Sequence, residues 1–238
     1  MAIGPDKRVM TRAEAAAAEI DVGLRSYMLR VYNYMASGLA LTGLVAYVAA
    51  NTPALMQAIY GTPLMWLVML SPLAFVLFLG FRIHRIRAST AQLVFWLFSG
   101  VMGLSLASIF IIYTQTSIAR VFFITAGTFA AMSLYGYTTK KDLSGWGSFL
   151  FMGLIGIIIA MVVNMFLASP ALYFAISVIG VLVFVGLTAY DTQRIKEMYL
   201  ASDTAEISSK KAIMGALRLY LDFINLFVML LALLGQRR

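Results

Sequence analysis

The amino-acid sequence predicts an all-α membrane protein whose helices cross the bilayer seven times. Hydrophobic residues make up 62% of the 238-residue chain and charged residues only 12%, which is about half the charged share of an ordinary soluble domain. Four long stretches contain no charged residue: 31–81, 88–119, 121–139 and 143–190. A spanning helix needs roughly 20 predominantly apolar residues, so the first and last stretches are each long enough for two spans.

Turn residues divide these stretches into seven expected spans. Asn51-Thr52-Pro53, Gly61-Thr62-Pro63 and Ser169-Pro170 interrupt the longest apolar runs, as Pro and Gly clusters do between helices. The expected spans are 31–50, 63–81, 90–113, 119–137, 146–168, 170–190 and 212–235. Loops this short leave no room for a second domain, so residues 1–238 are interpreted as one helical bundle. The N-terminal segment 1–30 carries nine charges and has no apolar core of a cleavable signal.

Lys and Arg residues concentrate on one side of the predicted bilayer. Fifteen of the 18 lie in segment 1–30 or near alternate loops at 82–87, 140–141 and 194–218, against Arg120, Arg237 and Arg238 on the other side. This asymmetry places the N-terminal segment in the cytoplasm of a multi-pass inner-membrane protein. It also accounts for the net charge of +8 without a nucleic-acid partner. Seven spans put the C-terminus outside, and a re-entrant last helix is the alternative.

Two aspartates lie at positions that a lipid-facing helix would not tolerate. Asp191 ends the sixth expected span in LTAYDTQRIKEMY, and Asp222 lies inside the seventh in LRLYLDFINLF. Only the 13 residues from Phe223 to Gly235 follow Asp222 before Gln236. That length corresponds to about 20 Å of helix, which is less than the hydrocarbon core of about 30 Å. The seventh span must therefore carry Asp222 into the membrane, where an ionisable residue is a candidate functional site.

The two aspartates are expected to approach each other, because the antiparallel sixth and seventh spans meet on the same side of the bilayer. Two close carboxyl groups share a proton more readily than both ionise, and their oxygens suit a cation such as calcium. We therefore interpret Asp191 and Asp222 as a pH sensor and a candidate calcium site. A purely structural alternative pairs Asp191 with Arg194 and Asp222 with Arg218.

Three further side chains are candidates for lining a polar path through the bundle. Arg218 and Asn225 share a helical face with Asp222, four residues before it and three after it. Asn164 lies within the fifth expected span, where it is either a pore-lining residue or interhelical glue. His84, the only histidine, lies among loop arginines and is expected to be solvated.

Three stretches closely resemble the signature segments of the Bax inhibitor family, the transmembrane Bax inhibitor motif group: GLTAYDTQRIKEMY, LYLDFINLF and LYGYTTKKDLS. The resemblance extends over nearly the whole chain from about residue 25. It implies six helices around a central seventh, and a pH-sensitive calcium leak with the aspartates at Asp191 and Asp222 as proton sensor. It also implies an arginine latch at the cytoplasmic end of the second helix, for which Arg82 is the best match and Arg85 the alternative.

The leading functional hypothesis is a proton-gated calcium leak channel that is not an enzyme and needs no cofactor. One alternative is an intramembrane aspartyl protease, because Tyr190-Asp191 matches a YD motif and Pro170-Ala171-Leu172 spells PAL. However, Asp222 stands in YLDF rather than GxGD, and the PAL sequence precedes both aspartates. The other alternative is a regulatory membrane protein that binds proteases or cell-death factors as its partners.

Overall fold

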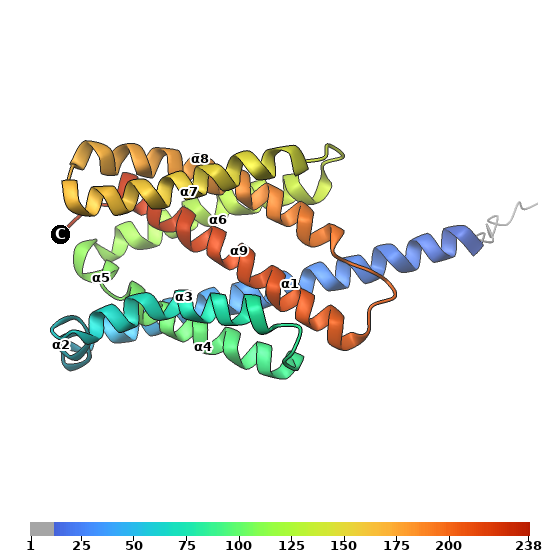
Figure 1. The fold of residues 1–238 in the computed structure, drawn as a ribbon, viewed down its shortest axis with the longest axis horizontal. Helices are drawn as coiled ribbons and strands as arrows, with labels where there is room; N and C mark the ends of the chain where they lie inside the picture. The colour runs from blue at the N-terminus through green and yellow to red at the C-terminus, as the bar shows by residue number, and fades with distance from the viewer. Residues whose placement is uncertain (1–11) are drawn as a thin grey trace, which may run out of the picture.

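In the computed structural model, which describes residues 12–238, the chain folds into a bundle of helices (Figure 1). They are α1 (Arg12–Ala50), α2 (Pro53–Tyr60), α3 (Leu64–Arg82), α4 (Ala88–Leu106), α5 (Ile109–Ile112), α6 (Gln115–Thr138), α7 (Ser144–Leu167), α8 (Pro170–Glu197) and α9 (Ala205–Leu234). Within the described residues, seven helical segments are long and apolar enough to span a membrane, with α4 and α5 counted as one segment. The predicted fold class is confirmed.

Each predicted span coincides with one of these seven segments, the third with α4 and α5 together, but three helices extend further than hydropathy indicates. α1 is already helical at Arg12, α8 continues to Glu197, and α9 begins at Ala205. Charged residues are costly in lipid but not in a helix, so hydropathy marks where the bilayer ends and not where the helix ends. The short α2 was predicted as a loop because of Pro53, yet proline is well suited to the first turn of a helix.

α9 is the most buried of the seven spans. It packs against α1, α3, α4, α6 and α8, and in Figure 1 it crosses between α1, α3 and α4 on one side and α6, α7 and α8 on the other. Small residues at its start permit this close packing, since a Cβ on Gly215 would lie 3.0 Å from Ile195. That all six other spans surround α9 stays a prediction.

The bundle has two ends that differ in charge. The basic end carries the loops 83–87, 139–143 and 198–204, and the far end carries α2, α5 and residues 235–238 (Figure 1). α9 runs without interruption from the basic end to the far end, and the side of the membrane on which the C-terminus lies stays a prediction. At the far end, backbone hydrogen bonds from Thr114 to Gln236 and from Arg238 to Ile112, both 3.0 Å long, attach the final residues to the segment before α6.

Candidate functional site

The structure brings the two predicted aspartates together where α8 packs against α9. Asp222 is only 5% exposed, and the side chain of Asp191 is 16% exposed. The two carboxyl groups line the same cavity and lie near enough to interact electrostatically. Oδ2 of Asp222 has no hydrogen-bond partner among the described residues. A buried polar atom without a partner lowers stability, so its presence at this position calls for a functional reason.

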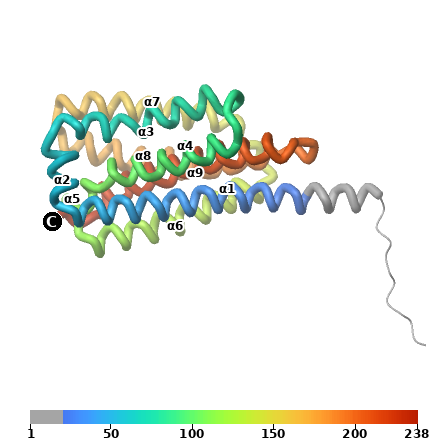
Figure 2. The backbone as a smooth tube through the Cα atoms, turned by 90° about the horizontal axis from the view of Figure 1, so that it is seen from below, coloured from blue at the N-terminus to red at the C-terminus, as the bar shows by residue number. Residues whose placement is uncertain are grey.

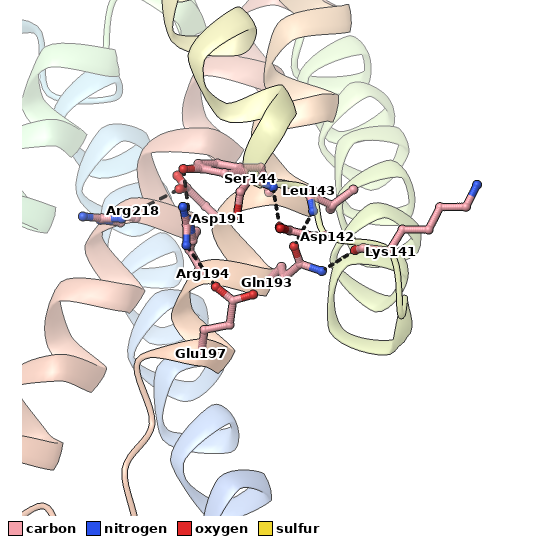
Figure 3. A network of polar contacts seen from close by, with 10 residues as sticks. Lys141, Asp142, Leu143, Ser144, Asp191, Gln193, Arg194, Glu197 and Arg218 are labelled. Atoms are coloured by element: carbon pink, nitrogen blue, oxygen red, sulfur yellow. Dashed lines mark hydrogen bonds and ion pairs between the residues drawn. The ribbon is translucent and has the colours of Figure 1, made fainter.

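Arg218 supplies the positive charge nearest to the aspartate pair. Its Nη1 lies 3.9 Å from Oδ1 of Asp191, and its side chain is half-exposed (Figure 3). Arg194 instead forms an ion pair with Glu197 at 3.1 Å and donates to the Tyr190 hydroxyl at 3.2 Å. Because the Arg218 side chain is half-exposed and its Nη1 lies near the limit of about 4 Å for an ion pair, this contact is weak.

The aspartate pair faces a cavity of about 570 Å³ between α7, α8 and α9, which we call the polar cavity. Its polar lining consists of Ser148, Tyr190, Asp191, Arg218, Asp222 and Asn225. The Nδ2 of Asn225 donates to the Leu221 carbonyl at 2.8 Å, which leaves the amide oxygen available to the cavity. Three of the sequence candidates, Arg218, Asp222 and Asn225, thus share one cavity because they share one face of α9.

A glycine allows α7 to pack closely against α8 beside this cavity. A Cβ on Gly147 would lie 2.6 Å from the Tyr190 ring, a separation that a real side chain cannot adopt. The missing side chain lets the Tyr190 ring, adjacent to Asp191 in sequence, lie between the two helices. The Arg194 guanidinium lies above this ring, 5.5 Å from the ring centroid, which is a distance typical of a cation–π contact.

The α6–α7 loop is bound to α8 next to the aspartate pair, which sequence analysis missed. The buried Gln193 donates to the Lys141 carbonyl and accepts from the Leu143 N–H, both at 2.8 Å (Figure 3). Lys196 donates to the Tyr137 carbonyl, also at 2.8 Å. The signature segments LYGYTTKKDLS and YDTQRIK are therefore in direct contact. The sequence feature that could have predicted this contact is the amide of Gln193, in a helix whose buried side chains are mostly apolar.

The remaining predicted residues lie away from the pair. Arg82 and Arg85 are exposed, and neither forms an ion pair with an aspartate among the described residues. His84 is exposed in the same loop, as expected for a solvated residue. Asn164 lies near the far end of α7, where its Oδ1 accepts from the Ser169 N–H at 3.0 Å. Asn164 therefore fixes the α7–α8 turn and does not line the polar cavity.

Two features limit the chemistry that the site can support. Within the described residues, no group of three or more His, Cys, Asp or Glu side chains comes together to hold a metal. Calcium takes six to eight oxygen ligands, so two carboxylates leave most of its coordination to water and carbonyls. Pro170, which opens the PAL sequence, begins α8 at the far end. It is separated from Asp191 by about 30 Å of helix at 1.5 Å per residue.

Comparison with known proteins gives consistent matches along the chain. The family model Bax1-I, described as inhibitor of apoptosis-promoting Bax1, matches residues 24–238. The inner membrane protein YbhL of Escherichia coli is 52% identical over 219 residues, which are 91% of this chain and 94% of YbhL. RP147 of Rickettsia prowazekii is 50% identical over 92% of both chains. A Caulobacter vibrioides protein is 45% identical over 95% of this chain and 94% of its own.

Proposed function

Because the chain belongs to the Bax inhibitor family, we propose that this multi-pass membrane protein is a pH-sensitive leak channel for calcium, gated by Asp191 and Asp222. The observation that carries the proposal is the adjacent, buried carboxyl pair on the polar cavity, in which Oδ2 of Asp222 has no hydrogen-bond partner among the described residues. Carboxylates inside a membrane bundle are costly, and they persist mainly where they serve a proton or an ion.

Competition between protons and cations at the pair provides the gating mechanism. Two adjacent carboxyl groups either hold a proton between them or present negative charge to a cation. A proton removes charge and one ligand oxygen, so it disfavours cation entry at that point. The small number of carboxylates favours brief binding, because a site that releases calcium must not enclose it. By the positive-inside rule, the basic end faces the cytoplasm.

Calcium flux in liposomes tests this proposal. The full chain is reconstituted with an internal calcium indicator, and flux is measured across a pH series. The parent protein is expected to show a pH-dependent flux, and Asp222→Asn is expected to lose that dependence because the amide cannot exchange a proton. Asp142→Asn is the matched control, since it removes an exposed carboxyl from the same end of the bundle. A parent-like pH profile in Asp222→Asn would contradict the proposed gate.

The same assay identifies the arginine that balances the pair. Arg218 lies beside Asp191 in this structure, whereas the family resemblance favours Arg82 or Arg85 as the latch. We expect Arg218→Gln to raise the basal leak, because the closed pair loses its counter-charge. If Arg82→Gln raises the leak and Arg218→Gln does not, the latch acts in a conformation other than this one.

The alternative functions give different results with the same preparations. A protease would cleave single-span membrane substrates, and its activity would disappear in Asp191→Asn. The distance between the PAL sequence and the aspartate pair disfavours this alternative. A purely regulatory protein would show neither flux nor cleavage, and it would have to be identified through a membrane-protein partner.

A further inference from the structure

A second cavity lies on the opposite side of α9 from the polar cavity, between α1 and α6, and we call it the α1–α6 groove. Figure 2 shows α1 and α6 on one side of the bundle and α3 and α7 on the other, with α9 between them. The groove has a volume of about 720 Å³, and its lining includes Ala36, Ala40, Ala126, Phe129, Ala130 and Phe223. It is comparable in size to the polar cavity, but apolar side chains form most of it.

The groove exists because α1 and α6 both pack against α9 rather than against each other. α1 lies along α4 and α9, and α6 lies along α8 and α9. A single hydrogen bond among the described residues joins α1 to α6, between the hydroxyl groups of Tyr32 and Ser133 at 2.7 Å. Toward the far end, a further cavity of about 360 Å³ continues from Leu39 and Phe122 along the same two helices.

The polar groups of the α1–α6 groove gather at the basic end. On α1 these groups are Arg25 and Tyr32, which lie on the part of the helix nearest the basic end. On α6 they are Ser133 and Tyr137, in its last two turns, and the rest of the lining is apolar. Among the described residues of this lining, Arg25 is the only charged one. A ligand that fits this distribution has a negatively charged head and a long apolar tail.

The dimensions of the groove match an acyl chain better than a helix. Its α1 wall runs from Arg25 to Ala40, which is about 22 Å at 1.5 Å per residue. One leaflet of hydrocarbon is about 15 Å deep, half of the core thickness, so an extended chain beginning at Arg25 stays within the groove. A helix is about 10 to 12 Å wide and cannot insert fully between α1 and α6, because the hydroxyl groups of Tyr32 and Ser133 are joined across the groove at 2.7 Å.

We propose that the α1–α6 groove binds one acyl chain of an anionic phospholipid from the surrounding bilayer, with the phosphate beside Arg25. The alanines Ala36, Ala40, Ala126 and Ala130 leave the space that the chain fills, and the Phe223 ring forms its floor. The Arg25 guanidinium provides the charge that distinguishes a phosphatidylglycerol headgroup from a zwitterionic one. This site is independent of the proposed leak.

Photocrosslinking with a lipid probe tests the site. The full chain is reconstituted in phosphatidylcholine containing a small fraction of phosphatidylglycerol with a diazirine in mid-chain, and labelled peptides are mapped by mass spectrometry. Label is expected mainly on the groove faces of α1 and α6. Ala130→Trp, at an exposed position, should lower groove labelling about tenfold, the equivalent of about 1.4 kcal/mol. Ala74→Trp is the control, since Ala74 is exposed on α3 across the bundle.

The headgroup contact is tested separately with Arg25→Gln. We expect the preference for the phosphatidylglycerol probe over a phosphatidylcholine probe to fall roughly fivefold, as for about 1 kcal/mol per arginine near an anionic surface. Arg87→Gln removes an exposed arginine from the same end and should leave the preference unchanged. Labelling spread evenly over α3, α7 and the groove would contradict the proposed site, because it would show only general contact with the bilayer. So would crosslinks between two copies across the groove, because the occupant would then be a second copy.

Discussion

The two cavities on either side of α9 are similar in size but opposite in chemistry. The polar cavity of about 570 Å³ contains Asp222, and the α1–α6 groove of about 720 Å³ contains its neighbour Phe223. Successive residues of a helix point about 100° apart, because one turn takes 3.6 residues. One peptide bond therefore separates the charged lining of one cavity from the aromatic floor of the other.

The contrast shows which neighbouring helices of the bundle pack tightly and which leave space between them. α6 and α8 pack so tightly that a Cβ on Gly136 would collide with the backbone of Ala189. α1 and α6 are held apart, and lipid covers the exposed apolar walls at no cost, since lipid tails are as apolar as those walls. Polar side chains have no such cover in a bilayer. The two ionisable side chains Asp191 and Asp222 therefore lie in the seam between α7, α8 and α9.

Adding a charge to the α1–α6 groove should have the largest effect. Phe223→Asp places a carboxylate in the apolar groove and removes a buried aromatic ring, which is 3% exposed. We expect a loss of at least about 3 kcal/mol in unfolding free energy from the lost packing and the charge in lipid. Denaturant unfolding in mixed micelles measures it, with Phe223→Leu as the matched control. Equal stability of the two variants would show that water already fills the groove.

The polar contacts beside the two cavities should differ in strength. Gln193→Leu removes both hydrogen bonds that bind the α6–α7 loop to α8, and should cost about 2 kcal/mol. Tyr32→Phe removes the hydroxyl contact that joins α1 to α6, and should cost at most about 1 kcal/mol, because Ser133 keeps its contact with Thr192 at 3.0 Å. The same unfolding measurement compares the two. A larger loss in Tyr32→Phe would mean that the groove is stabilised by its polar end.

Much of this contrast follows from the sequence, and its limits have a physical cause. Hydropathy reports depth along the membrane normal, so it located the spans and predicts the depth of Asp222. Helical periodicity then placed Arg218 and Asn225 on the face of Asp222. The rotation and separation of two helices are set by side-chain packing between them, which a single sequence does not encode locally. For this reason the partner of Arg194, the turn contact of Asn164 and the α1–α6 groove emerged only from the structure.

The smallest expected effect concerns Asp142 in the α6–α7 loop, near the polar cavity. Its carboxylate accepts from the Ser144 N–H at 2.8 Å. Hydrogen bonds from the hydroxyl and the backbone N–H of Ser144 hold the pKa of Asp142 below its usual range. Because α7 begins at Ser144, the negative charge also lies next to the positive end of the helix dipole.

A lowered pKa in the folded state determines the sign of the pH dependence. The contribution of Asp142 is complete above its unfolded-state pKa of about 3.9, and it is lost as the pH falls through the lower pKa of the folded state. Asp142→Asn should therefore lower the thermal midpoint slightly at pH 6, and the difference from the parent should disappear on acidification below about pH 3. Thermal unfolding at several pH values measures this difference. Salt should shrink it as well, because Asp142 is exposed and its charge is screened. A difference that persists unchanged in acid would mean that the asparagine disturbs the turn itself, and that the charge of Asp142 adds nothing to the start of α7.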